Sequence, residues 1–260
     1  MDEKDLIKQA TIEAIYWWND SEDFYHKCFS KLDKILENDE YWEFFKKKIL
    51  KSFLNNYSIR RNIPESDKGF NKYFNELKKT AFISKVKKGD IKVIDEICAV
   101  LKCKMDKYLK GKTNKNGKEI KGKNTKSLLS KIAHMINPND YPIYDNFTKD
   151  SLWLRVKKQQ NYKLKRKEFD EYLKYKEGIL GLIDEFNRNK QFENAYSVLN
   201  DYKGTLAYKF FIINERAFKF RVVDKLLWFE GNKRNSDKKG NNFTNDYLYC
   251  YKKFLKLMEK

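Results

Sequence analysis

The sequence contains few of the residues from which disulfide frameworks, metal centres and loop-rich folds are built. Its 260 residues include three prolines, ten glycines and two histidines, His26 and His134. Two histidines do not make a histidine-rich metal site, so we expect no metal and no other cofactor. The four cysteines are widely spaced and form no C-x-x-C pair, which indicates reduced and mostly buried thiols. They are Cys28, Cys98, Cys103 and Cys250.

Long apolar runs are also missing. No stretch approaches the roughly 18 apolar residues that a membrane-spanning helix needs. The first ten residues, MDEKDLIKQA, are acidic and unlike a secretory signal peptide. We therefore expect a cytoplasmic protein that does not bind membranes.

Positive charge is abundant and unevenly distributed. The net charge is +19, and residues 1–45 carry five lysines against twelve acids, a net of −7, which leaves +26 for the rest of the chain. A lysine- and asparagine-rich chain can reflect an AT-biased coding sequence. A body this basic is nevertheless drawn to polyanions through counterion release. Nucleic acid is therefore the leading class of partner that we expect.

Apolar residues recur with helical spacing along most of the chain, as in DLIKQATIEAIYWW near the N-terminus. Residues 206–223 are the best strand candidate, because their aromatic residues partly alternate. A helix is favoured there, since RVVDKLLWFEG continues the pattern of an amphipathic helix up to Gly231. We predict a compact all-α protein. The other predicted helices cover 22–36, 40–55, 70–86, 90–110, 125–136, 146–157, 166–186, 191–200 and 243–258.

Two basic runs divide the chain. Residues 104–126 hold nine lysines and two acids in a polar loop or short hairpin, and residues 155–176 hold nine basic residues and three acids. A run of charged residues usually forms a solvent-exposed face, but these two runs lie on either side of one motif, residues 127–147. We predict a single helical unit, 1–260, that can form two lobes. Its parts are an N-terminal region 1–103, the basic loop 104–126, a catalytic-like region 127–231 and a C-terminal helix 232–260.

The bracketed motif, SLLSKIAHMINPNDYPIYDNF, covers residues 127–147. On a helix its apolar residues form one arc, with Lys131 at the edge beside Ser127 and with His134 pointing away. NPNDYP ends this helix, because proline disfavours helix in its own and the preceding position. Asp145 is then placed to cap a second helix. Taken singly, Asp145 is a cap worth about 1 kcal/mol, and Lys131 is a lysine that extends from an apolar surface to solvent.

The order helix, proline, aspartate, helix in SKIAHMI and YPIYDNFTKDSLW resembles the core of the HhH-GPD superfamily of DNA glycosylases. The resemblance covers about 30 residues. It implies that Lys131 is the catalytic lysine and Asp145 the catalytic aspartate. The family has a Gly-x-Gly just before the lysine, where it grips a DNA phosphate, and this chain has Ser127 and Leu129 there. The interval from the lysine to the aspartate is also several residues shorter than usual.

The resemblance implies a DNA N-glycosylase that excises a modified or damaged base, with or without lyase activity at the resulting abasic site. Such enzymes flip the nucleotide out of the duplex, and an amine can then form a Schiff base with the sugar. We expect Lys123, Lys126 and Ser127 to contact phosphate in place of the missing glycines. Aromatic side chains would hold the base, and the candidates are Trp17, Trp18, Tyr57, Tyr144 and Trp153. Of these Tyr144 and Trp153, together with His134, are predicted to line the base pocket.

A second nucleic-acid contact is predicted at Arg60 and Arg61, because the arginine fork suits phosphate or a base edge. Glu119-Ile120-Lys121, with Asp106 upstream, formally matches a PD-(D/E)xK nuclease, but its flanks are polar. No HEPN-type arginine–histidine pair and no phosphate-binding GxxxxGK[ST] loop occurs. Two alternatives remain: a non-enzymatic nucleic-acid-binding protein, and an interaction protein whose acidic N-terminal segment docks on a basic face.

Overall fold

Helices account for nearly all the regular structure of the computed structural model, which describes residues 2–59, 63–64, 66–113, 116–158 and 165–239. Within these ranges there is no strand, and one isolated bridge joins Thr113 to Glu119 in the basic loop. The prediction of an all-α fold is confirmed. None of the helices in these ranges combines the length and the apolar character that a membrane span requires.

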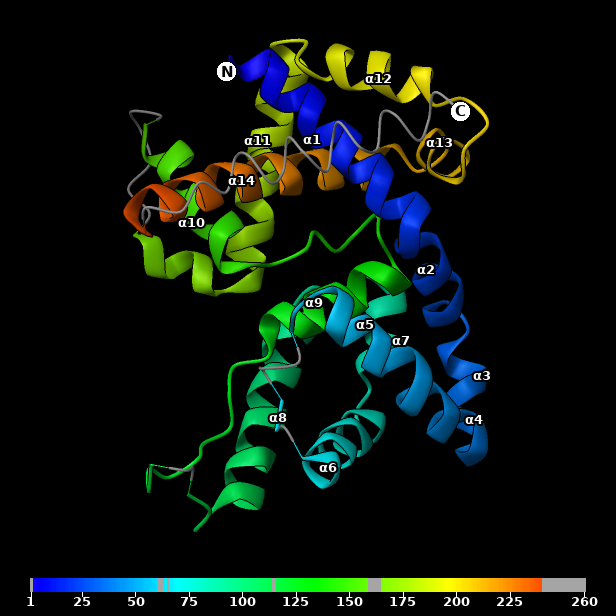
Figure 1. The fold of residues 1–260 in the computed structure, drawn as a ribbon, viewed down its shortest axis with the longest axis vertical. Helices are drawn as coiled ribbons and strands as arrows, with labels where there is room; N and C mark the ends of the chain where they lie inside the picture. The colour runs from blue at the N-terminus through cyan, green and yellow to red at the C-terminus, as the bar shows by residue number, and fades with distance from the viewer. Residues whose placement is uncertain (1, 60–62, 65, 114–115, 159–164, 240–260) are drawn as a thin grey trace.

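One group of helices, here called the α14 group, packs around the long helix α14 (Glu215–Lys239), as Figure 1 shows. Helix α1 (Glu3–Trp17) packs on α14 and α12, and α10 (Asn146–Lys158) lies along α14. The remaining members are η4 (Arg166–Asp170), α11 (Tyr172–Arg188), α12 (Phe192–Asp201) and α13 (Leu206–Phe211).

The second group, the α9 group, surrounds α9 (Lys126–Ile136) and contains several helices of only six or seven residues. Its other members are α2 (Asp23–Phe29), α3 (Leu32–Glu37), α4 (Asp39–Phe44), η2 (Phe45–Leu50), α5 (Lys51–Asn56), α6 (Asp67–Lys78), α7 (Phe82–Lys87) and α8 (Val93–Leu109). A π-helical segment, η1 (Trp18–Glu22), joins α1 to α2 and so links the two groups. The segment 137–145 crosses back from α9 to α10 (Figure 1).

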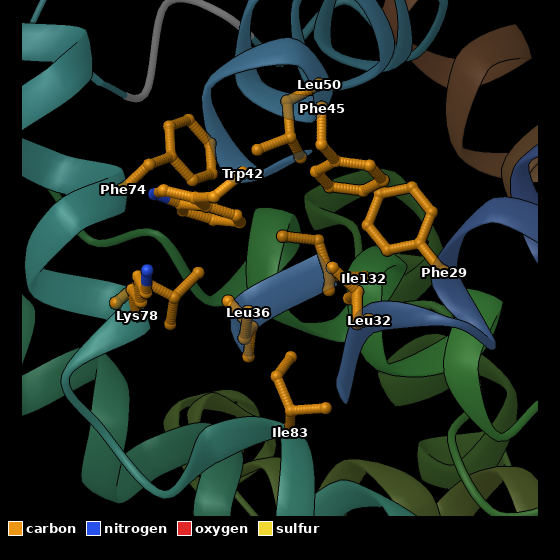
Figure 2. Close-up of a pocket in the computed structure, with 11 residues that line it drawn as sticks. Phe29, Leu32, Leu36, Trp42, Phe45, Leu50, Phe74, Lys78, Ile83 and Ile132 are labelled. Atoms are coloured by element: carbon orange, nitrogen blue, oxygen red, sulfur yellow. The ribbon is translucent and has the colours of Figure 1, made fainter. Parts of the chain in front are cut away.

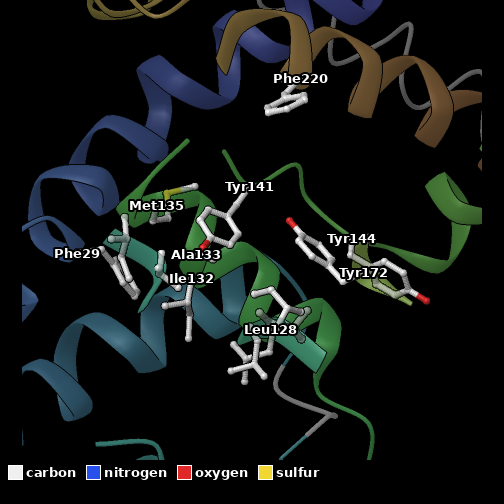
Figure 3. Close-up of a cluster of buried hydrophobic side chains, with 14 of the residues drawn as sticks. Phe29, Leu128, Ile132, Ala133, Met135, Tyr141, Tyr144, Tyr172 and Phe220 are labelled. Atoms are coloured by element: carbon white, nitrogen blue, oxygen red, sulfur yellow. The ribbon is translucent and has the colours of Figure 1, made fainter. Parts of the chain in front are cut away.

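Helix α9 is the most deeply enclosed helix of its group. Every side chain of α9 except that of Ser127 is buried. Figure 3 shows the apolar ones packed among side chains from α2, from the 141–144 segment and from α11. A cavity of about 20 Å³ beside Ile132 is lined almost entirely by apolar side chains (Figure 2). It is too small and too apolar to hold more than one weakly bound water, so it is a packing defect of the core.

Two predicted boundaries are corrected by the helices. Helix α8 continues to Leu109, so the basic loop begins at Lys110 and not at residue 104. Helix α14 runs through Gly231 to Lys239 and does not end at the glycine. A Cβ atom on Gly231 would lie 2.7 Å from the Phe147 carbonyl oxygen, so the glycine allows α14 to approach α10 closely.

Most of the other helices are found where they were predicted, but the predicted helix 22–36 is divided into α2 and α3, and the predicted helix 70–86 into α6 and α7. Residues 206–223, the strand candidate, are helical in α13 and in the start of α14. The predicted helix 166–186 is divided, because η4 ends at Asp170 and α11 begins at Tyr172. The predicted helix 243–258 lies outside the described residues.

His134 does not point away from the core, as its place on the helix had suggested. Its side chain is fully buried, because the chain returns over α9 after the NPND turn. Its Nδ1 lies 2.8 Å from the Tyr141 carbonyl oxygen, and its Nε2 has no hydrogen-bond partner. Burial, aided by the Arg221 guanidinium, lowers the pKa of His134 to about 3.

This histidine should make the protein sensitive to mild acid. The unfolded chain carries a histidine with a pKa near 6.5, so below that pH it binds a proton that the folded protein excludes. The free energy of unfolding should therefore fall as the pH drops from 7, by about 2 kcal/mol at pH 5. Urea unfolding at pH 7 and at pH 5 would measure this fall in the free energy of unfolding. A His134→Gln variant, which keeps His26, should lose about 2 kcal/mol less over the same interval, and an equal loss would contradict the assignment.

Candidate active site at Lys131 and Asp145

Lys131 and Asp145 face each other across the junction of α9 and α10. The Lys131 Nζ lies 3.8 Å from the Asp145 Oδ2 and donates a hydrogen bond to the Ser127 Oγ at 3.0 Å. The two residues that the resemblance pairs therefore lie close together in the fold. The side chain of Lys131 is 7% exposed and that of Asp145 is 29% exposed. An amine with most of its water removed thus meets a carboxylate that solvent can reach.

Local hydrogen bonds hold Asp145 in place. Its Oδ1 accepts from the Phe147 backbone N–H at 2.8 Å, which is the expected helix cap. Its own N–H donates to the Thr148 Oγ1 at 3.2 Å. One residue earlier, the Tyr144 N–H donates to the Ser130 Oγ on α9 at 3.0 Å. The cap uses one carboxylate oxygen and the other faces Lys131, so the capping role and a chemical role are compatible.

An aromatic pair borders the lysine. The ring centre of Tyr57 lies 5.8 Å from the Lys131 Nζ, and the Trp17 ring lies 6.0 Å from that of Tyr57. The Lys225 Nζ on α14 lies 4.7 Å from the Trp17 ring centre. The side chains of Tyr57, Trp17 and Lys225 are all half-buried. Of the five aromatic candidates, the structure places Tyr57 beside the Lys131 Nζ, and Trp17 beside Tyr57.

A buried charged cluster lies behind Tyr57. The Tyr57 hydroxyl donates to the Glu22 Oε1 at 2.6 Å, and Glu22 also accepts from Arg221. Arg221 donates to the Asp224 Oδ2 at 2.5 Å as well. Glu22 comes from η1, whereas Arg221 and Asp224 both come from α14. The cluster thus ties Tyr57 in the α9 group to the α14 group.

The pKa values in this cluster follow its burial. Burial alone would lower the pKa of Arg221, but the carboxylates of Glu22 and Asp224 raise it above its usual value. Burial raises the pKa of Asp224, and the Arg221 guanidinium opposes this shift. Burial also raises the pKa of Tyr57 well above 10, and Glu22 adds to the effect. The Tyr57 hydroxyl therefore remains a hydrogen-bond donor to Glu22 at any pH near neutrality.

The predicted phosphate contacts fall into different environments. Lys123 is exposed in the basic loop. Lys126 is buried, is ion-paired with Asp95 and donates to the Asp170 carbonyl oxygen, so it links helices and is not available to a phosphate. Ser127 is half-buried and accepts the hydrogen bond of Lys131. Arg60 and Arg61 lie outside the described residues.

The three side chains predicted to line a base pocket have other partners. Tyr144 is buried, packs edge-on against Tyr175 at 5.0 Å, and donates to Asp170 at 3.4 Å. His134 is bound to the Tyr141 carbonyl oxygen, as described above. The Trp153 ring is half-buried beneath the Lys157 Nζ at 5.1 Å. Sequence reasoning missed Lys225, because an amphipathic pattern gives no sign of which aromatic ring a lysine covers.

The part of the chain that the structure describes contains no group of three or more histidine, cysteine, aspartate or glutamate side chains placed to hold a metal ion. Comparison with models of known families, with curated proteins and with solved structures found no match for this chain. The chemistry of the site is therefore argued from its own geometry.

Proposed function

We propose that this protein is a DNA glycosylase that excises a modified or damaged base and whose catalytic residues are Lys131 and Asp145. The observation that carries the proposal is the pair itself, a largely buried amine 3.8 Å from a more exposed carboxylate. The resemblance of the two segments that carry these residues to the HhH-GPD core supports the same assignment.

The chemistry follows from the two groups. As the bond between the sugar C1′ and the base nitrogen breaks, its electron pair leaves with the base, which takes up a proton, and positive charge develops on the sugar. The Asp145 carboxylate stabilises that charge from a fixed position. Lys131 first gives up its ammonium proton to solvent, so Asp145 remains a carboxylate while the bond to the base breaks. The neutral Lys131 amine then forms a bond to C1′ and loses a proton. The C1′–O4′ bond breaks with its electron pair on O4′, which takes up a proton, and the product is a Schiff base protonated on nitrogen.

The surface charge supports DNA as the substrate. The loop between α8 and α9 carries exposed lysines, and so do the end of α10 and the segment before α11. In sequence these two sets lie on either side of Lys131 and Asp145. They are Lys110, Lys112, Lys118, Lys121 and Lys123 in the loop, and Lys157, Lys158, Lys165 and Lys167 in the second set. Such surfaces bind the DNA backbone with an affinity that falls steeply as salt rises.

Borohydride trapping tests the proposal. The protein is incubated with labelled DNA that carries an abasic site or one of a panel of modified bases, and borohydride reduces any Schiff base to a stable amine. Wild type should give a covalent adduct, and Lys131→Gln should give none. Lys176→Gln is the matched control, because Lys176 is also a buried lysine but belongs to α11. It should form the adduct as wild type does.

Two results would contradict parts of the proposal. Release of a base without any adduct would remove the covalent step and leave Asp145 and a water molecule as the catalysts. No adduct and no base release, with salt-sensitive DNA binding retained, would favour a non-enzymatic DNA-binding protein. The exposed lysines alone suffice for that alternative.

A further inference from the structure

Four side chains from distant parts of the sequence form a continuous row beside the candidate active site. The row runs from Lys131 to the Tyr57 ring at 5.8 Å, from Tyr57 to Trp17 at 6.0 Å, and from Trp17 to the Lys225 Nζ at 4.7 Å. Trp17 ends α1, Tyr57 follows α5 and Lys225 lies on α14. A positively charged group thus lies at each end of an aromatic pair.

Each of the two rings has a lysine ammonium over it, and they differ in what else holds them. The Tyr57 ring packs against Phe53 at 4.8 Å, and its hydroxyl is held by Glu22. The Trp17 indole is fixed at its edge, where its Nε1–H donates to the Glu13 Oε1 at 2.8 Å. Its face is covered by the ammonium of Lys225, which ends a flexible four-carbon chain on a half-buried residue. A lysine can leave an aromatic face, whereas a packed ring cannot.

We propose that the flipped base stacks on Trp17 in place of the Lys225 ammonium, and that Lys225 then donates a hydrogen bond to an acceptor on the edge of that base. This inference rests on the glycosylase function proposed above. Stacking on an aromatic ring is favourable for every base, so the stacking step itself selects little. The Lys225 ammonium would discriminate between bases, because it can donate hydrogen bonds to a base edge but cannot accept them.

The substrate class follows from this charge. A base that presents a carbonyl oxygen gains a charge-assisted hydrogen bond, which is stronger than a neutral one. A base that alkylation has made cationic meets the ammonium as a like charge. Burial lowers the pKa of Lys225 to about 8, with the Arg221 guanidinium adding to the effect, so the amine is still mostly protonated at pH 7. We therefore assign neutral, carbonyl-bearing bases as substrates and exclude cationic alkylated ones.

The test compares base release with abasic-site trapping in the same proteins. Labelled duplexes carry uracil, hypoxanthine or 8-oxoguanine as carbonyl-bearing bases, and 7-methylguanine as the cationic base. Trp17→Leu and Lys225→Met should each slow release of the carbonyl-bearing bases by about tenfold or more. Lys225→Arg, which keeps a charged donor, should retain most of the rate. Because an abasic site has no base to stack, all three variants should form the borohydride-trapped adduct about as fast as wild type.

Each alternative outcome has a distinct meaning. If adducts form and the Trp17 and Lys225 variants release every base at the wild-type rate, the inference is overturned and the proposed function stands. If 7-methylguanine is the preferred substrate, the assigned substrate class is overturned. If wild type forms no adduct and releases no base, the proposed function fails and the inference fails with it. Should Trp17→Leu not fold, the Lys225→Met and Lys225→Arg pair still decides the question.

Discussion

Replacing Asp145 with asparagine is expected to slow base release by about 10²–10³-fold, the usual effect of removing one preorganised group that stabilises charge in a transition state. Asparagine has nearly the same shape, and its side-chain oxygen can still accept the hydrogen bond from the Phe147 N–H. Asparagine and aspartate are also about equally good helix caps. The substitution therefore removes the negative charge that faces Lys131 while it leaves the start of α10 intact.

Single-turnover base release would measure the effect, and thermal unfolding of the same variant should be nearly unchanged. Asp150→Asn serves as the control, because Asp150 lies on the same helix and pairs with Arg166 at the surface. Its rate should stay close to that of wild type. If Asp145→Asn releases bases within about threefold of wild type while Asp145→Ala unfolds more easily, Asp145 is only a cap.

Replacing Arg221 with methionine is expected to lower the free energy of unfolding by about 3–5 kcal/mol. Arg221 is 2% exposed and is the partner of two carboxylates, those of Glu22 and Asp224. Without the guanidinium, two buried carboxylates would lie close together with no cation between them. One or both would have to take up a proton or draw water into the core, and either change destabilises the folded state.

Urea unfolding would measure this loss, and two further variants make the result specific. Arg155→Met removes an arginine that also pairs with two glutamates but is 20% exposed, so its loss should be clearly smaller. Combining Arg221→Met with Glu22→Gln and Asp224→Asn removes all three charges and should recover much of the stability. A loss below about 1 kcal/mol for Arg221→Met alone would show that the carboxylates do not depend on it.

The pairing of Lys131 with Asp145 could be predicted because it is encoded locally. The prolines, the cap and the helical pattern all lie within residues 127–147, so one local turn already directs Asp145 toward the helix that carries Lys131. The type of most helices was predictable for the same reason, since the period of the apolar residues is a local property. The helix boundaries near Gly231 and residue 104 could not be predicted, because glycine and lysine occur in loops as well as in helices.

The surroundings of the pair could not be predicted, because they depend on contacts between distant residues. Glu22 and Arg221 are 199 positions apart in the sequence. The π-helical turn η1 also shifts the helical register, so the side of the helix on which Glu22 lies does not follow from the ordinary 3.6-residue period. His134 was misplaced for a related reason: a helical pattern shows where the apolar arc lies but not which segment covers the opposite side.

The division of the molecule into two helix groups has a consequence for how the proposed activity depends on the fold. Lys131 lies on α9, in the α9 group. Asp145 follows the crossing segment and caps the start of α10, in the α14 group. Tyr57 and Arg221 repeat this arrangement, since they come from different groups and share Glu22. Neither group holds both of the proposed catalytic side chains, so the proposed reaction requires that the two groups be aligned. Any perturbation that loosens their alignment should abolish turnover before it unfolds either half.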